Sequence, residues 1–151
     1  MKYLLLTGLI ALPQLGLAGE FCTLDGTERF ACTLKGGQKY VEVCDAQWLD
    51  GFNASYGYMT PGQAPELEIT QDMASMTYEP WNGMGNPPWA SVTFTASDHL
   101  HRYRVWYHGD DGGITVLKGE EELVTLDCDP GTVVHDLDQL IDSIDTAQIS
   151  P

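Results

Sequence analysis

The chain has 151 residues, and its 22 Asp and Glu against seven Lys and Arg give a formal net charge of −15 at pH 7. Binding to nucleic acid or to an anionic membrane surface is therefore disfavoured, because Lys and Arg are needed to meet phosphate groups. A basic partner, by contrast, would be attracted at long range. Solubility alone also accounts for such a charge, since net charge by itself identifies no partner.

The first 18 residues have the pattern of a signal peptide. Lys2 precedes an apolar run over residues 4–17, and Gly16-Leu17-Ala18 supplies small residues for a signal peptidase. The run is shorter than the roughly 20 apolar residues of a membrane-spanning helix, and no Cys follows it directly, as a lipoprotein signal requires. We predict cleavage near Ala18 and no membrane anchor. The mature part, residues 19–151, is then one soluble, periplasmic or secreted β-barrel-like domain.

Apolar alternation and turn residues recur about every 8–12 residues, which is typical of a β-sandwich or barrel. The predicted strands cover residues 30–34, 39–44, 53–59, 66–70, 91–96, 101–108, 114–118 and 121–128. Gly36-Gly37 and Gly119-Glu120 have the composition of two-residue hairpin turns, and residues 110–113 are expected to turn the chain into the strand that starts at Ile114. The pattern predicts an all-β fold, a small antiparallel barrel or sandwich of about eight strands.

One helix is predicted, over residues 135–145. Leu137, Leu140, Ile141 and Ile144 share one of its faces, and acidic residues occupy much of the remainder. This short C-terminal helix would pack against the sheet or fray.

The cysteines of the mature part predict two disulfides, because an even count in an exported chain favours bridges over free thiols. A zinc site would need close C-x-x-C pairs, and the spacings here are wide. The four residues are Cys22, Cys32, Cys44 and Cys128.

The hairpin register disfavours one of the three possible pairings. With Gly36-Gly37 as a two-residue loop, Cys32 lies opposite Val41, and Cys44 points to the other face of the hairpin. Their Cβ atoms are then too far apart for a bridge. Of the two remaining connectivities we prefer Cys22–Cys44 together with Cys32–Cys128.

Motifs for catalysis are absent from the sequence. It contains no nucleophile elbow, no Cys/His signature and no glycine-rich phosphate loop between a strand and a helix. His99 and His101 are the best metal candidates, since alternate residues of a strand share a face. A metal needs three or four converging ligands, so we expect ordinary surface histidines. We predict a protein that is not an enzyme and binds no metal or cofactor.

The loop of residues 81–89 is the most unusual segment. It places Trp81, Met84 and Trp89 among glycines and prolines. Trp is favoured in binding hot spots, so this loop is a candidate recognition surface. We expect instead that both indoles fold back and cap one end of the barrel, where they supply core area. Trp81 and Trp89 remain candidate binding residues.

Two resemblances extend this interpretation. Residues 30–37 (FACTLKGG), 41–44 (VEVC), 56–58 (YGY) and 65–69 (PELEI) resemble a family of small exported proteobacterial proteins of unassigned function. That similarity covers most of the mature chain. Residues 103–111 (YRVWYHGDD), 114–116 (ITV) and 126–128 (LDC) resemble the C-terminal half of the periplasmic and membrane-bound inhibitors of c-type lysozyme.

The second resemblance implies a barrel that plugs the lysozyme cleft with a Ser loop and a Lys loop. This chain departs from that pattern at both tips. His108 stands where the inhibitors have Lys, and Ser97 is the nearest serine, followed by Asp98, with His101 in the place of a Tyr. The candidate inhibitory residues are thus Ser97, His108 and Lys118.

We therefore predict a non-enzymatic binding protein of the bacterial envelope. Its most concrete function would be inhibition of a cationic hydrolase such as a c-type lysozyme. Alternatives are a lipocalin-like barrel that holds a small apolar ligand in its interior, or a structural protein of the periplasm.

Overall fold

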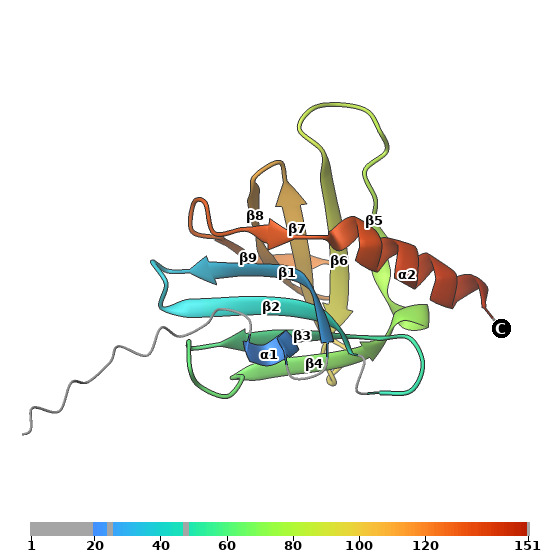
Figure 1. Cartoon of the computed structure of the whole chain (residues 1–151), viewed down its shortest axis with the longest axis horizontal. Helices are drawn as coiled ribbons and strands as arrows, with labels where there is room; N and C mark the ends of the chain where they lie inside the picture. The colour runs from blue at the N-terminus through green and yellow to red at the C-terminus, as the bar shows by residue number, and fades with distance from the viewer. Residues whose placement is uncertain (1–19, 24–25, 47–48, 151) are drawn as a thin grey trace, which may run out of the picture.

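The structure is a computed structural model that describes residues 20–23, 26–46 and 49–150, so the predicted signal peptide lies outside the described residues. Two five-stranded antiparallel sheets form the body of the protein. Sheet A has the order β10-β1-β2-β3-β4 and sheet B the order β5-β6-β7-β8-β9. In Figure 1 the strands of sheet A run across the view, and β6 of sheet B stands steeply to them.

The ten strands fall into the two sheets as follows. Sheet A contains β1 (Gly26–Leu34), β2 (Lys39–Ala46), β3 (Asn53–Met59), β4 (Leu67–Asp72) and β10 (Val134–His135). Sheet B contains β5 (Thr77–Glu79), β6 (Trp89–Thr95), β7 (His101–His108), β8 (Asp111–Lys118) and β9 (Glu121–Asp127). The helices are α1 (Glu20–Thr23), α2 (Leu137–Ile149) and the short 3-10 helix η1 (Met73–Ser75).

The all-β prediction is confirmed, and two of its details are wrong. The eight predicted strands correspond to β1–β4 and β6–β9, but the short strands β5 and β10 were not predicted. The described strands also do not form a closed barrel, because no hydrogen-bonded ladder joins the two sheets within that part of the chain. The interruption lies at η1, where the Asp72 carboxylate accepts the Ala74 N–H and the chain leaves sheet A for sheet B.

The β1–β2 hairpin has the predicted register, with Cys32 opposite Val41, but its ladder ends at Leu34 and Lys39. Residues 35–38 form a four-residue turn instead of a two-residue one. The cause is tertiary: the Asp129 carboxylate accepts the backbone N–H groups of Gly36 and Gly37, at 2.8 Å each.

The structure contains the disulfides Cys22–Cys44 and Cys32–Cys128, which is the preferred one of the two connectivities that the strand register left open. Cys32 belongs to the buried cluster between the sheets. Cys44 lies on the opposite face of β2, where it joins α1 to the outer surface of sheet A. Two disulfides are consistent with an extracytoplasmic location.

Side chains from both sheets and α2 fill the space between the sheets. Phe30, Tyr56 and Phe94 are among the largest fully buried side chains. The predicted apolar helix face, completed by Ala147, belongs to the same cluster. The helix begins two residues later than predicted, because His135 pairs with Phe30 in the sheet. It also ends four residues later than predicted, at Ile149. Among the described residues, no helix is long and apolar enough to cross a membrane.

The turn between β7 and β8 lies two residues earlier than the sequence suggested. His108 pairs with Asp111, so the loop consists of Gly109 and Asp110, and Gly109 has a φ of 64°. Gly112 and Gly113 lie within β8, where the first leaves room for the ring of Phe30.

Candidate functional site

The 81–89 loop extends beyond both sheets between β5 and β6 (Figure 1). Its conformation is held internally: the Trp81 Nε1–H donates to the Met84 carbonyl at 3.1 Å, and the Asn82 side chain accepts the Met84 N–H at 2.9 Å. Met84 is 72% exposed and Trp81 is 39% exposed. The predicted cap is therefore wrong, since neither Trp81 nor Trp89 belongs to the buried core. Glycines with positive φ at 83 and 85 carry the loop away from the sheets.

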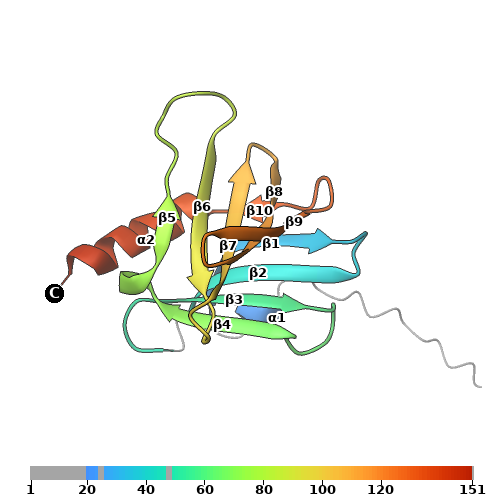
Figure 2. The ribbon, with the colours of Figure 1, turned by 180° about the vertical axis from the view of Figure 1, so that it is seen from behind.

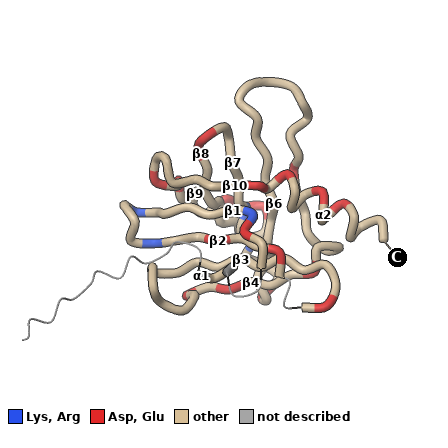
Figure 3. The backbone as a smooth tube through the Cα atoms, viewed as in Figure 1, with Lys and Arg blue, Asp and Glu red and all other residues tan. Residues whose placement is uncertain are grey.

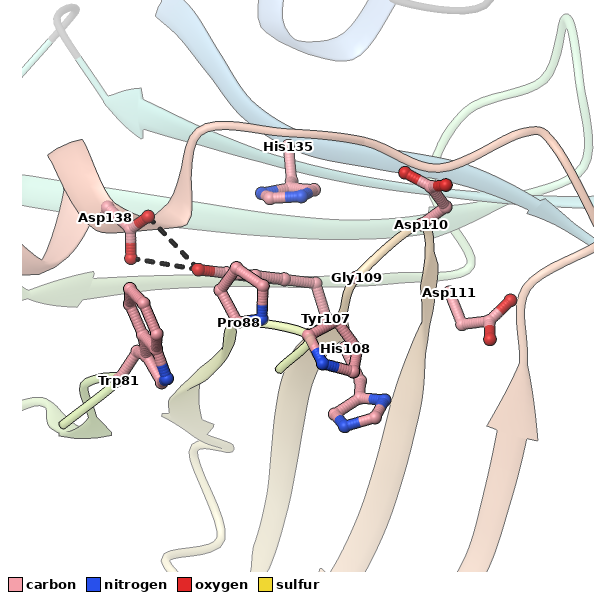
Figure 4. Close-up of a pocket in the computed structure, with 10 residues that line it drawn as sticks. Trp81, Pro88, Tyr107, His108, Gly109, Asp110, Asp111, His135 and Asp138 are labelled. Atoms are coloured by element: carbon pink, nitrogen blue, oxygen red, sulfur yellow. Dashed lines mark hydrogen bonds between the residues drawn. The ribbon is translucent and has the colours of Figure 1, made fainter. Parts of the chain in front are cut away.

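An open groove of about 890 Å³ lies beside the base of this loop. Its walls come from the loop, from the end of β7, from the β7–β8 turn, from β10 and from the first turn of α2. We call it the loop-end groove and define it by Trp81, Pro88, Tyr107, His135 and Asp138, together with the Asp110-Asp111 pair. Figure 4 shows these side chains around the opening.

Tyr107 organises the floor of the loop-end groove. Its hydroxyl donates to both carboxylate oxygens of Asp138, at 3.2 and 3.1 Å, and its ring stacks on His135 with centroids 3.8 Å apart (Figure 4). Burial, and then the hydrogen bond to the Asp138 carboxylate, raise the pKa of Tyr107 to about 12. The phenol therefore keeps its proton at neutral pH, and it orients the carboxylate toward the groove.

The charge of the loop-end groove is entirely acidic. Three of its ten lining residues are Asp, and none is Lys or Arg. Figure 3 shows acidic positions at the β7–β8 turn and along α2, beside this end of the molecule. Carboxylates next to exposed aromatic faces are the groups that attract a Lys or Arg side chain.

The structure separates the candidate binding residues into two groups at opposite ends of sheet B. His108 pairs with Trp89 at the end that carries the groove. Lys118 pairs with His101 at the other end, and Ser97 lies in the β6–β7 turn at that same end. The Ser and Lys positions suggested by the inhibitor resemblance are therefore not brought together with His108.

The expected shared face of His99 and His101 is also wrong. His99 lies in the β6–β7 turn with a φ of 58°, and only His101 is in β7. Asp98 organises this turn: its carboxylate accepts the backbone N–H groups of His101 and Leu100 and contacts His101 Nδ1 at 2.6 Å. The backbone and imidazole of His101 hold the pKa of Asp98 below its usual range. The described residues contain no group of three or more His, Cys, Asp or Glu that could hold a metal ion.

Tyr107, His135 and Asp138 had no signal in the sequence. Tyr107 is an inward position of a strand, and His135 was assigned to the helix. Their contacts join residues about 30 positions apart. Only the packing of α2 against the end of β7 makes them neighbours.

No protein-family model, curated protein or solved structure matches this chain. Both family resemblances thus stay predictions.

Proposed function

We propose that this protein is a non-enzymatic binding protein that captures a basic protein through the loop-end groove. The observation that carries the proposal is an open, aromatic groove lined by three Asp and two His, with no Lys or Arg, placed beside an exposed loop. The most concrete partner is a cationic hydrolase of the c-type lysozyme class.

The physical argument has a long-range and a short-range part. If residues 1–18 are removed, six basic and 22 acidic residues remain, a net charge of −16 that steers a cationic partner toward the molecule. At contact, Trp81 offers an aromatic face and Asp138 a carboxylate to one Lys or Arg side chain. The exposed Met84 and Trp81 supply the apolar area that interface centres need.

The position of the groove changes how inhibition would work. The 81–89 loop, with His108 beside it, would be the element that enters the cleft of the hydrolase. Ser97 and Lys118 would take no part, since they lie at the far end of sheet B. Replacing Lys118 is then expected to leave binding unchanged, whereas replacing Trp81 weakens it.

The test is a titration of a c-type lysozyme with the purified, disulfide-bonded protein, following lytic activity and binding heat at low and at physiological salt. We expect binding and inhibition at low salt that weaken as the Debye length shortens. Asp110→Asn with Asp111→Asn, and separately Trp81→Ala, should each weaken binding about tenfold or more. The matched control, Asp50→Asn with Glu68→Gln, removes the same charge at exposed positions away from the groove and should change binding by less than about threefold.

Two results would contradict the proposal. Absence of binding at large molar excess and low salt would exclude this partner class. Equal weakening by the groove variants and the charge-matched control would show that net charge acts without the groove.

The interior-ligand alternative receives no support from the fold. The position of such a ligand, between the sheets, is filled by Phe30, Tyr56 and Phe94, each no more than 2% exposed. These rings are part of one continuous hydrophobic cluster.

A further inference from the structure

The outer face of sheet B, opposite the core, carries a regular array of polar side chains. One row across all five strands reads Thr77, Thr93, Arg104, Thr115 and Thr125. The adjacent row contains Ser91, Trp106 and Gly113. Figure 2 shows this side of the molecule, and no helix lies in front of β6 and β7.

Trp106 lies against this face because its cross-strand neighbour has no side chain. A Cβ on Gly113 would approach the six-membered ring of Trp106 to 2.7 Å, so the indole occupies the space that any other residue would fill. Trp106 is half-buried in this position. The sheet thus presents part of a large, fixed aromatic side chain to solvent.

Arg104 differs from the other arginines of the described chain. Arg29 pairs with Asp45 and Asp136, and Arg102 contacts Glu120 and the Gly119 carbonyl. Arg104 has no ion pair or hydrogen bond within the described residues, although the chain has 22 acidic side chains. It is half-buried on the central strand, between the buried hydroxyls of Thr93 and Thr115.

These groups define the chemistry of a ligand. A guanidinium binds a carboxylate through two parallel N–H donors, and an indole packs against an apolar ring face. Arg104 and Trp106 are two residues apart on one strand, or about 7 Å, which is the scale of one sugar ring with its carboxylate. We propose that the outer face of sheet B binds a saccharide that carries carboxylate groups, with the carboxylate on Arg104 and a ring on Trp106.

The acidity of the chain does not prevent such binding. Four acidic residues belong to the same face: Glu79 on β5, Asp111 on β8, and Glu122 and Asp127 on β9. Two of them are hydrogen-bonded to hydroxyls of this face, Glu79 to Ser91 and Glu122 to Thr125. Arg104 is the only charged side chain in its own row of the sheet, so a carboxylate seated on that row meets the guanidinium first.

The experiment is isothermal titration of the purified protein with trigalacturonic acid and with its methyl ester at physiological salt, together with Trp fluorescence. We expect saturable binding of the acid and binding of the ester weaker by about tenfold or more, because the ester cannot form the charged pair. Arg104→Gln should weaken binding of the acid by a similar factor, and Arg104→Lys by less, since it keeps the charge but loses the planar fork. Lys35→Gln, which removes an exposed positive charge in the β1–β2 turn, is the matched control and should leave affinity unchanged.

Three results would overturn the inference: no saturable binding of the acid, equal affinity for acid and ester, or full affinity in Arg104→Gln. If Arg104→Gln fails to fold, Arg104→Lys takes its place in the test. Full affinity of Arg104→Lys for the acid would then overturn the proposed bidentate contact. Binding of a lysozyme should be the same in Arg104→Gln and the unmodified protein, so this inference and the proposed groove function fail separately.

Discussion

The outer face of each sheet carries a charged side chain in the middle of its central strand, Glu42 on β2 and Arg104 on β7, and α1 covers only Glu42. Arg102 shares the face of Arg104 but is paired with Glu120. Glu42 is fully buried, and its carboxylate accepts the backbone N–H groups of Phe21 and Cys22 at 3.2 and 3.1 Å. The Cys22–Cys44 disulfide holds the same segment against the sheet. Arg104 has no such cover and no partner in the described chain.

This difference separates structural charge from charge that is available for a ligand. A buried carboxylate with two donors is part of the fold, because losing either side leaves a buried polar group unpaired. A guanidinium without an ion pair contributes little to folding through its charge. A contribution to stability therefore accounts for the presence of Glu42 at its position but not for that of Arg104.

The largest effect on stability is expected from removing the Cys22–Cys44 disulfide, which holds α1 on the outer face of sheet A. Cys22→Ala with Cys44→Ala opens a link between residues 22 positions apart and should lower the free energy of unfolding by about 3 kcal/mol, measured by urea denaturation. Trigalacturonate binding at the opposite face should not change. A loss below about 1 kcal/mol would show that α1 does not depend on its disulfide.

The second largest effect is expected in how the free energy of unfolding depends on pH, through the titration of Glu42. Burial, and then the nearby Glu28 carboxylate, raise the pKa of Glu42 from 4.5 to about 7 against the opposing hydrogen bonds from α1. The folded state then binds the proton more tightly than the unfolded state, so this group's contribution to stability is fullest below pH 4.5 and is lost as the pH rises to about 7.

The measurement is the free energy of unfolding of the unmodified protein relative to Glu42→Gln across this pH range. The stability of the unmodified protein relative to Glu42→Gln should fall by about 3 kcal/mol as the pH rises from 4.5 to about 7. Above about pH 7 this stability difference should stay constant. The exposed Glu68→Gln serves as control and should show no such slope. A difference that rises with pH would contradict the assignment.

A smaller loss of stability is expected from adding a side chain at Gly57, where Phe21 contacts sheet A. Gly57 leaves room for it: a Cβ there would lie 2.8 Å from Met59 Cε and 3.0 Å from the Phe21 ring. Gly57→Ala should cost about 1 kcal/mol through overpacking, measured by thermal or urea unfolding. Adding Phe21→Leu should recover part of this loss, since neighbouring residues act non-additively. Strict additivity would contradict the contact.

The smallest effect is expected at Arg104. Arg104→Gln should change the free energy of unfolding by less than about 0.5 kcal/mol, because no partner is lost. The matched variant is Arg29→Gln, which removes the 2.7 Å ion pair to Asp45, a residue whose other oxygen is already buried without a partner. That variant should cost about 1–3 kcal/mol. Equal losses at the two arginines would show that Arg104 is structural.

Several features were predictable because their causes are local. Residues 91–96 and 101–108 alternate apolar and polar side chains, and both form strands close to the predicted bounds. Gly119-Glu120 connects Lys118 to Glu121 as a two-residue turn, as expected. The four-residue spacing of the apolar residues in α2 indicated the buried face correctly, although a sheet pair at His135 displaced the helix start.

Other features depend on partners that are distant in sequence. β5 and β10 have three and two residues, too few for a periodic pattern, and they exist through pairing with β6 and β1. The β1–β2 turn was lengthened by Asp129, more than 90 residues away. The loop-end groove likewise requires α2 to lie against the end of β7.

The sequence by itself determined that the chain is an acidic, all-β protein, and its hairpin register disfavoured the pairing of Cys32 with Cys44, which the structure does not contain. Alternation and turn chemistry act between near neighbours, so they can be read without the fold. Only the tertiary structure decided that the strands form two sheets, that α1 buries Glu42, and that Arg104 and Trp106 stay uncovered. These outcomes depend on which surfaces pack against each other, because a covering element and the face it covers come from different parts of the chain.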